Sequence, residues 1–250
     1  MIGRKLHNKG EEMVRSDSMR RPLYRWLREG ERGGQVVYYI AGVGFWLLAK
    51  KIPYVGTRIV EIPWTLGKLK ELQIKEGLEV LQVGNVILKK ALSKHNVTLV
   101  DLDAEEKSQA GLEVYKADIR SVSLPESYFD VAISISTLEH IGLQEPEFAD
   151  GDKVAIRIVA KALKPGGLFF FTVPFGKTIT ERTFRVYDRA RLKFSLGDDF
   201  EVLEERFLTW EKLRWQDTPP HEAEKAGFLK NNYSMNLGIC LIRARKKNRS

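Results

Sequence analysis

From Glu61 onward, the chain alternates short apolar runs with helical periods, and no other feature constrains its fold as strongly. Helical periods occur at Val86–His95 and Val154–Leu163, between runs of apolar and β-branched residues that predict strands. These runs are Val80–Val83, Val97–Leu102, Leu112–Tyr115, Phe129–Ile135 and Leu168–Val173. Strands that alternate with helices form a parallel sheet with helices on both faces. The sequence therefore predicts an α/β fold with a doubly wound sheet.

The pattern changes beyond Pro174, where a helix at Asp188–Leu196 is followed by strands at Phe200–Phe207 and Asn236–Arg243. The sheet domain is accordingly expected to span residues 61–250. Residues 1–60 are expected to form a basic and apolar N-terminal extension that is partly helical.

The extension contains one apolar stretch, Val36–Ala49, between flanking basic residues. A membrane-spanning helix needs about 20 apolar residues, so this stretch is short for a span. Two other roles remain open for residues 36–49. They pack on the sheet domain or on a second copy of the chain, or they lie in a membrane interface with Tyr38, Tyr39 and Trp46 at headgroup level. No signal peptide is evident, which predicts a cytoplasmic location, with peripheral membrane contact through this stretch as the variant.

The basic charge of the chain lies at its ends. The net charge is +8, of which +5 belongs to the tail of residues 243–250 and +4 to residues 1–34, leaving −1 for the remainder. A charged tail is usually solvated, so nucleic acid is disfavoured as a partner. Cys240 is the single cysteine, which excludes an intramolecular disulfide and a cysteine-based zinc site, and no metal site is expected.

In open parallel sheets, ligands bind beyond the carboxyl ends of the strands, so residues that follow each strand are the candidates for a site. Asp101 ends the second strand, seventeen residues after Gly84, where a carboxylate can accept hydrogen bonds from both hydroxyls of a ribose. Asp103 competes for that role, and Asp101 alternatively caps the following turn. Asp118, after the third strand, either accepts from an adenine amino group or is an ordinary loop acid.

Several segments resemble class I S-adenosylmethionine-dependent methyltransferases of the type 11 kind. They occur in the order and spacing of that superfamily and cover roughly Glu61 to Arg243: VLQVG, VTLVDLD, YKADI, LPESYFDVAISISTLEHIGL and ALKPGGLFFFTVPFGK. EIPW at Glu61–Trp64 and FRVYD at Phe184–Asp188 resemble a branch associated with surface-glycan genes. The resemblance implies a Rossmann-like, seven-stranded sheet that is mostly parallel with an antiparallel last strand. It also implies S-adenosylmethionine as cofactor.

The resemblance assigns cofactor contacts to residues after the first four strands. Gly84 with Asn85 would meet the methionine part, Asp101 with Leu102 the ribose, Asp118 with Ile119 the adenine, and Ser134 with Ile135 the sulfonium. The turn Lys164–Gly167, before the fifth strand, is given a structural role only.

The opening turn departs from the family pattern, which has an acid before the first glycine and two further glycines after it. Here Gln82, Val86 and Leu88 occupy those positions. Asn85 is expected to supply a left-handed conformation, whereas the branched side chain of Val86 is expected to crowd the carboxypropyl arm of the cofactor. Either affinity is lowered or the site is vestigial. The retention of Asp101 and Asp118 favours a working site.

His140 is the candidate general base for removing a proton from the acceptor, since histidine commonly changes charge near neutral pH. A capping or packing role is the alternative. The acidic loop Gly142–Asp152 is expected to be solvated and to end with Asp152 as a helix N-cap. The basic segment Gly176–Leu192, which includes Arg185, Tyr187 and Arg191, either holds an anionic acceptor or forms the exposed face of a helix.

The leading hypothesis is methyl transfer to a small-molecule, glycan or lipid-linked acceptor. An RNA methyltransferase is one alternative, supported only by the basic ends of the chain. A degenerate fold that acts as a binding subunit is the other, and a homo-oligomer is compatible with all three. A nicotinamide dehydrogenase is disfavoured, because its three-glycine fingerprint is absent.

Overall fold

The computed structural model of the chain describes residues 56–73, 76–86, 92–105, 108, 110–143, 150–181, 183–211, 214–227 and 238–248. By its internal contacts the chain divides into Met1–Ile59 and Val60–Ser250, and the fold below is that of the second unit. The apolar stretch Val36–Ala49 lies outside the described residues. No described helix is both long and apolar enough to cross a membrane.

An eight-stranded sheet forms the centre of the second unit, in the order β3-β2-β1-β4-β5-β10-β8-β9. Strands β1 to β5 pair in parallel, and β10 is antiparallel to both of its neighbours, β5 and β8. The strands are β1 (Glu79–Val83), β2 (Asn96–Val100), β3 (Leu112–Tyr115), β4 (Phe129–Ile135), β5 (Leu163–Phe175), β8 (Phe200–Glu211), β9 (Arg214–Asp217) and β10 (Gly238–Lys246). The predicted Rossmann-like fold with an antiparallel last strand is confirmed.

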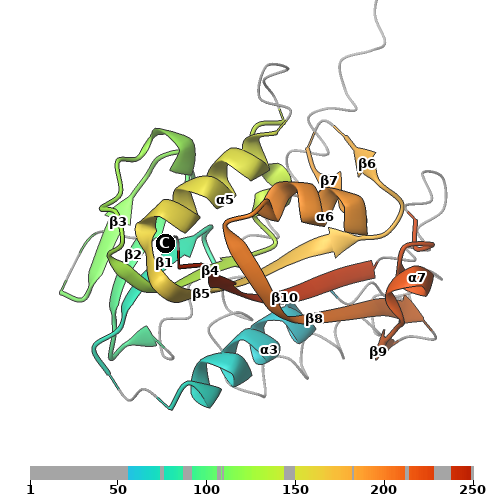
Figure 1. Cartoon of the computed structure of the whole chain (residues 1–250), viewed down its shortest axis with the longest axis horizontal. Helices are drawn as coiled ribbons and strands as arrows, with labels where there is room; N and C mark the ends of the chain where they lie inside the picture. The colour runs from blue at the N-terminus through green and yellow to red at the C-terminus, as the bar shows by residue number, and fades with distance from the viewer. Residues whose placement is uncertain are drawn as a thin grey trace, which may run out of the picture. The chain divides into compact units, whose positions relative to one another are not determined.

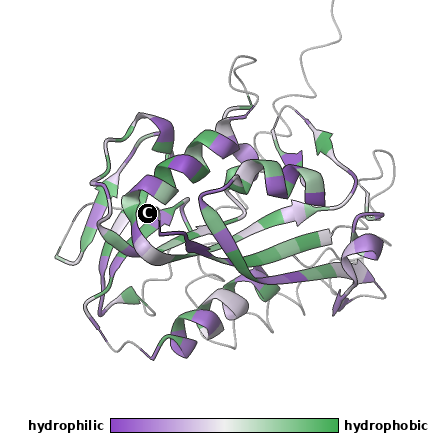
Figure 2. Ribbon diagram, in the orientation of Figure 1, coloured by the Kyte–Doolittle hydropathy of each residue, from purple (hydrophilic) through white to green (hydrophobic). Residues whose placement is uncertain are grey.

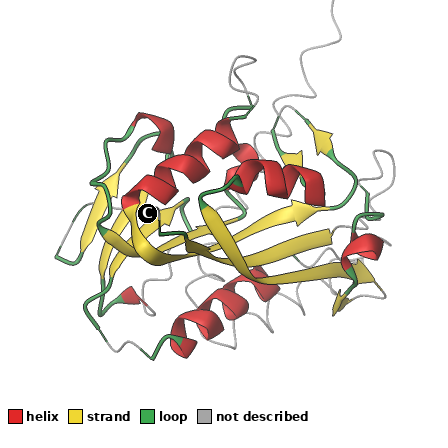
Figure 3. Ribbon diagram, viewed as in Figure 1, coloured by secondary structure: helices red, strands yellow, loops and turns green. Residues whose placement is uncertain are grey.

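Helices cover both faces of this sheet, as Figure 1 shows. Helices α5 (Gly151–Ala162) and α6 (Arg189–Leu196) lie on one face, and α3 (Arg58–Glu71) lies on the other. The remaining elements are short: the 3-10 turns η1 (Ile119–Ser121) and η2 (Leu138–His140), the helix α7 (Pro220–Ala223), and the hairpin of β6 (Ile179–Thr180) and β7 (Arg185–Val186). Figure 3 distinguishes these elements by type.

Two apolar clusters hold the layers together, because successive side chains of a strand point to opposite faces. In β4, Val131, Ile133 and Ile135 belong to the cluster beneath α3, whereas Ala132 belongs to the cluster beneath α5 and α6. Phe129 also belongs to the second cluster, because the register of β4 shifts between Phe129 and Val131. Both clusters are buried, so the central strands are apolar on both faces (Figure 2). The predicted near-continuous apolar runs therefore follow from burial on two sides.

The order of the strands reverses beside β1, and this reversal positions the site. From β1 the chain builds outward through β2 to β3, and then returns to add β4 and β5 on the other side. Open α/β sheets bind ligands beyond the carboxyl ends of the strands at such a reversal. Residues just after β1, β2 and β4 are thus brought to one edge.

The structure differs from the sequence-based expectation at the far edge of the sheet. Strand β9 adds an eighth strand by pairing with β8, at a stretch where no strand was predicted. Part of the basic C-terminal segment belongs to the sheet, because β10 continues to Lys246. Arg243 pairs with Glu71, Arg245 pairs with Glu201, and Lys246 donates to the carbonyl of Leu163. These cations contact groups of the same domain, and this weakens the argument that the basic segment binds RNA.

Candidate functional site

The register of the sheet brings the predicted cofactor residues to one edge. Val83 of β1 pairs with Val100 of β2 and with Ser134 of β4, so the residues that follow these positions are neighbours. The N–H of Gly84 donates to the carbonyl of Val100 at 2.9 Å, which ties the turn after β1 to the end of β2. Asp101 follows directly on Val100. The structure therefore places Gly84, Asp101 and Ser134 together.

The turn after β1 requires glycine at position 84 for two reasons. Gly84 has φ +96°, a conformation that residues with a side chain rarely adopt. A Cβ at this position would also lie 2.0 Å from the hydroxyl oxygen of Thr137, in the segment after β4. The carbonyl of Gly84 accepts from the side-chain amide of Gln82 at 3.0 Å and from the N–H of Val86 at 2.9 Å. Gln82, at the position of the family's acid, thus supports the turn.

Two expectations about this turn are wrong. Asn85 is not among the described residues with positive φ, because Gly84 alone makes the reversal and the Val86-to-Gly84 hydrogen bond closes a three-residue turn around Asn85. Val86 is 8% exposed and belongs to the apolar cluster beneath α3, so its side chain is part of the core. The side chain that crowds Gly84 is that of Thr137. Leu88 lies outside the described residues.

Asp101 occupies the predicted position after β2, with one oxygen engaged locally. Its Oδ1 accepts the N–H of Asp103 at 2.7 Å, which shapes the turn, so the capping role is observed, and the ribose-binding role stays a prediction. The next residue, Leu102, is 63% exposed, the highest value among the large apolar side chains that are described as exposed. An apolar surface beside a carboxylate at this edge suits a nucleoside, which has a planar base and a polar sugar.

Asp118 and Ile119 are held more tightly than the sequence suggests. Asp118 caps η1 through the N–H of Arg120 at 2.8 Å, and the guanidinium of Arg120 contacts both of its oxygens. Burial opposes ionisation of Asp118, but the hydrogen bonds from Arg120 outweigh it and lower the pKa of this carboxyl group. Ile119 is 3% exposed and packs in the core beneath α5. A contact of Ile119 with adenine would therefore come from its backbone.

Ser134 and Ile135 lie at the end of β4, where the sulfonium pocket is predicted. The hydroxyl of Ser134 is fully buried and has no hydrogen-bond partner among the described residues. A buried hydroxyl without a partner is costly unless a ligand or water satisfies it. Ile135 packs in the cluster beneath α3.

His140 lies in η2, directly after this edge, and its side chain is 55% exposed. Its Nδ1 is 2.5 Å from the carbonyl oxygen of Thr183. Because a carbonyl can only accept, Nδ1 carries the proton, and the neutral ring then has its lone pair on Nε2. This is the form in which an imidazole acts as a general base.

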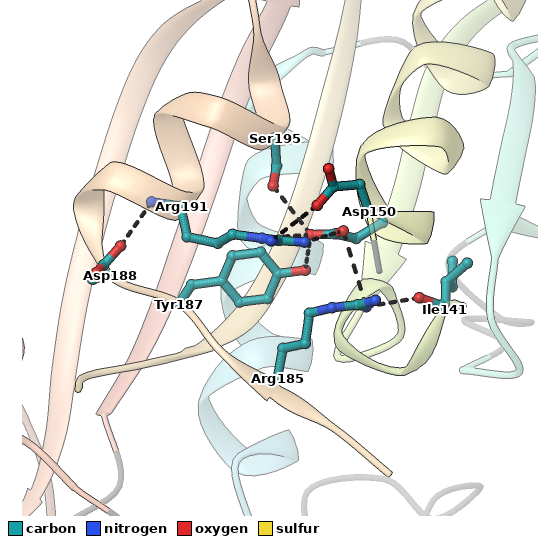
Figure 4. Close-up of polar contacts among 8 residues, drawn as sticks. Ile141, Asp150, Arg185, Tyr187, Asp188, Arg191 and Ser195 are labelled. Carbon is teal, nitrogen blue, oxygen red and sulfur yellow. Dashed lines mark hydrogen bonds and ion pairs between the residues drawn. The ribbon is translucent and has the colours of Figure 1, made fainter. Parts of the chain in front are cut away.

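Three side chains of the basic segment Gly176–Leu192 form a polar cluster inside the protein, namely Arg185, Tyr187 and Arg191, whereas Arg189 is exposed on α6. Asp152 is fully buried and accepts hydrogen bonds from Tyr187 at 2.8 Å, from Arg191 at 2.6 Å and from Ser195 at 3.1 Å. Arg185, also buried, lies 3.9 Å from Asp152 and donates to the carbonyl of Ile141 at 2.7 Å. Figure 4 shows these side chains converging from the β7–α6 segment on the start of α5.

The same cluster corrects the predicted N-cap. Helix α5 begins at Gly151, so Asp152 lies in its first turn and points into the protein, whereas the N-cap residue is Asp150. Burial, followed by the charges of Asp152 and Glu139, raises the pKa of Tyr187 well above its ordinary value, so Tyr187 stays a hydrogen-bond donor. Residues 144–149 of the acidic loop lie outside the described residues. Within the described ranges, no group of three or more His, Cys, Asp or Glu side chains is arranged to hold a metal ion.

Sequence reasoning gave no role to Glu61, Thr137 or Thr172, all of which lie at this edge. EIPW and FRVYD were recognised only as patterns. The structure shows that their polar members, Glu61 on one face and Arg185 with Tyr187 on the other, are buried. A charged residue inside an otherwise apolar motif was the available signal, since such residues are buried only when paired.

Comparisons with known proteins point to one family. Residues 81–171 match the family model described as a methyltransferase domain. Among curated proteins, none is similar to the chain in sequence. Solved structures do share the fold. One is the 1,6-didemethyltoxoflavin-N1-methyltransferase of Burkholderia thailandensis with bound 1,6-didemethyltoxoflavin and S-adenosylhomocysteine, at 18% identity and TM-score 0.51 over 99% of this chain and 94% of that one.

Two further structures have similar scores. The N-methyltransferase NodS from Bradyrhizobium japonicum WM9, in complex with S-adenosylhomocysteine, is 16% identical with TM-score 0.51, over 79% of this chain and 93% of that one. The [4+2]-cyclase SpnF is 18% identical with TM-score 0.50, over 74% of this chain and 80% of that one. At these identities the structural similarity shows the fold alone.

Proposed function

We propose that this chain, whose residues 81–171 match the model of a methyltransferase domain, is a class I S-adenosylmethionine-dependent methyltransferase that acts on a small-molecule, glycan or lipid-linked acceptor. S-adenosylmethionine, when bound, supplies an electrophilic methyl group on a sulfonium centre. The observation that carries the proposal is the shared edge of β1, β2 and β4, with Gly84, Asp101 and Ser134. The left-handed glycine, the carboxylate and the buried hydroxyl without a partner fit this cofactor.

We assign the described residues to parts of the cofactor as follows. The Asp101 carboxylate, which shapes its own turn through the N–H of Asp103, accepts from the ribose hydroxyls, and Leu102 covers the base. Gly84 admits the methionine part to the backbone, and the hydroxyl of Ser134 faces the sulfonium end. Asp118 lies at the adenine end, where Arg120 already contacts it, so an amino group would share its oxygens with that cation.

The chemical step requires alignment of donor and acceptor, together with removal of a proton from the acceptor. Alignment alone can contribute about 7–11 kcal/mol to catalysis. His140 is the proposed base, because its Nδ1–H is held by Thr183 and its Nε2 is therefore the basic atom. The exposure of the ring leaves it accessible to an acceptor.

Two observations support the proposed class of acceptor. Two structures that share the fold contain small molecules. One is the Burkholderia thailandensis enzyme with 1,6-didemethyltoxoflavin, and the other is a Haemonchus contortus N-methyltransferase with phosphomonomethylethanolamine (TM-score 0.50, 16% identity, over 74% of this chain and 53% of that one). RNA is disfavoured as an acceptor, because three basic residues of the C-terminal segment have partners within the fold. The proposal accordingly keeps small molecules, glycans and lipid-linked sugars.

Asp101→Asn is expected to weaken binding of S-adenosylhomocysteine by about 10- to 100-fold, because hydrogen bonds to a charged group are worth roughly 1.5–3 kcal/mol. The asparagine keeps an oxygen for the N–H of Asp103, so the turn is preserved. Isothermal titration calorimetry measures the effect. Asp103→Ala is the matched control and should remain within about twofold of the wild type. Equal losses in both variants would assign the ribose elsewhere, and no binding by the wild type at millimolar ligand would favour a non-catalytic binding subunit.

His140→Gln is expected to lower methyl transfer by about 10²- to 10⁴-fold while leaving the affinity for S-adenosylhomocysteine unchanged, as for loss of a general base. Transfer is measured with tritiated S-adenosylmethionine and bacterial extracts separated into lipid, polar small-molecule, glycan and RNA fractions, which also identifies the acceptor class. His221→Gln, at a histidine that is 74% exposed, is the control. Undiminished transfer by His140→Gln would exclude the residue as the base.

A further inference from the structure

Glu61 is a fully buried carboxylate that joins α3 to the ends of β4 and β5. Its Oε1 accepts a hydrogen bond from the hydroxyl of Thr172 at 2.6 Å and another from the hydroxyl of Ser136. Ser136 lies 75 residues from Glu61 in the sequence, and Thr172 lies 111 residues away. A carboxylate is rarely buried so completely unless its oxygens are paired or hydrogen-bonded. The question is what this one holds in place.

The residue that Glu61 holds has an unusual backbone. Ser136 has φ +39°, in the left-handed region that residues other than glycine, asparagine and aspartate seldom occupy. The N–H of Ser136 donates to the carbonyl of Thr172 at 3.1 Å and to its hydroxyl at 3.0 Å. Together with the bond from its hydroxyl to Glu61, these contacts fix Ser136 against Thr172. Such strained residues persist only where their surroundings hold them.

The strained serine determines where the next residue lies. Thr137 follows Ser136 directly, and its side chain lies against Gly84, so closely that a Cβ on Gly84 would meet it at 2.0 Å. Thr137 is held in place by its own hydroxyl, which donates to the carbonyl of Ile135 at 3.1 Å. The path from Glu61 through Ser136 to Thr137 therefore ends at the glycine proposed to meet the methionine part of the cofactor.

We propose that Glu61 is a positioning residue of the cofactor site: it holds Ser136 in the left-handed conformation that turns Thr137 onto Gly84, and Thr137 thereby lines the methionine end of the cofactor. This inference rests on the proposed function and adds three residues to the site. It also explains how an opening turn with one glycine retains a defined shape, because the segment after β4 packs Thr137 against Gly84.

The test compares two substitutions of Ser136. Ser136→Ala removes the hydroxyl that reaches Glu61 and keeps the cost of a left-handed backbone, so S-adenosylhomocysteine should bind about tenfold more weakly. Ser136→Gly removes the same hydroxyl but lowers that cost, so its affinity should lie within about threefold of the wild type. If Ser136 only stabilised the fold, the glycine variant would not bind S-adenosylhomocysteine more tightly than the alanine variant. Glu61→Leu should lose at least as much affinity as Ser136→Ala.

Thr65→Val is the matched control, because Thr65 is buried one turn further along α3 and its hydroxyl donates to the carbonyl of Glu61 at 2.9 Å. It should lower the thermal midpoint and leave the affinity unchanged. The inference is overturned if Ser136→Ala binds like the wild type, if Ser136→Gly binds no better than Ser136→Ala, or if Thr65→Val loses as much affinity. If Glu61→Leu does not fold, the comparison of Ser136→Ala with Ser136→Gly tests the inference. Wild-type binding is measured first, and its absence would instead refute the proposed cofactor site and this inference with it.

Discussion

Replacing Asp152 with alanine is expected to lower the free energy of unfolding by about 3–5 kcal/mol, the usual cost of removing one partner from a buried ion pair. Asp152 is fully buried and is the anion shared by Arg191, Arg185 and Tyr187. Without it, two buried or half-buried cations lose a counter-charge within the cluster that joins α5 to α6. Urea denaturation, followed by circular dichroism, measures the loss.

Asp150→Ala is the matched control for this prediction. Asp150 also pairs with Arg191, at 3.2 Å, but its side chain is 50% exposed. Exposed ion pairs contribute about 0–1 kcal/mol, so this variant should stay within that range of the wild type. If both variants lost the same amount, burial would not be what makes Asp152 important. The comparison separates charge from burial, because the two carboxylates share one guanidinium.

Gly84→Ala is expected to have the second large effect, on stability and on cofactor binding together. A side chain at φ +96° costs about 1–3 kcal/mol, and the overlap of the new Cβ with Thr137 adds about 1–3 kcal/mol, as for overpacking elsewhere. Relief of the overlap would push Thr137 away from the edge of the sheet, so S-adenosylhomocysteine should bind about 100-fold more weakly. Denaturation and calorimetry measure the two losses.

Two further variants divide the loss into its parts. Gly166→Ala places a Cβ at φ +76° with nothing within 4 Å, so it reports the cost of conformation alone. Adding Thr137→Gly to Gly84→Ala removes the overlapping side chain and should recover the steric part only. A double variant no more stable than Gly84→Ala would show that Thr137 does not set the cost.

Much of the fold follows from the sequence, because periodicity is a local property. The apolar runs from Val80 to Val173 predicted strands that the structure contains, and their alternation with helices predicted the parallel pairing. The edge of the site followed as well, since strand ends in a doubly wound sheet must meet at the switch in strand order. Gly84, Asp101 and Ser134 were therefore found without coordinates, although their contacts with the cofactor stay predictions.

The direction of single side chains in irregular turns was beyond reach of the sequence. Val86 was expected to crowd the cofactor and is in the core, because the left-handed residue of the turn is Gly84 and not Asn85. The helix α5 begins before Asp152, so a predicted N-cap became a buried anion. In both cases a shift of one or two residues at an element's end changes the face on which a side chain lies.

What the sequence by itself determined is the order of strands and helices, and with it the place where a nucleotide cofactor would bind. Only the tertiary structure decided which polar partners the buried carboxylates meet. Glu61 joins Ser136 and Thr172, and Asp152 joins Tyr187 and Arg191, across separations of 35 to 111 residues. No local pattern encodes such pairs, because a buried charge finds its partner only when the sheet has brought distant segments within a few ångströms.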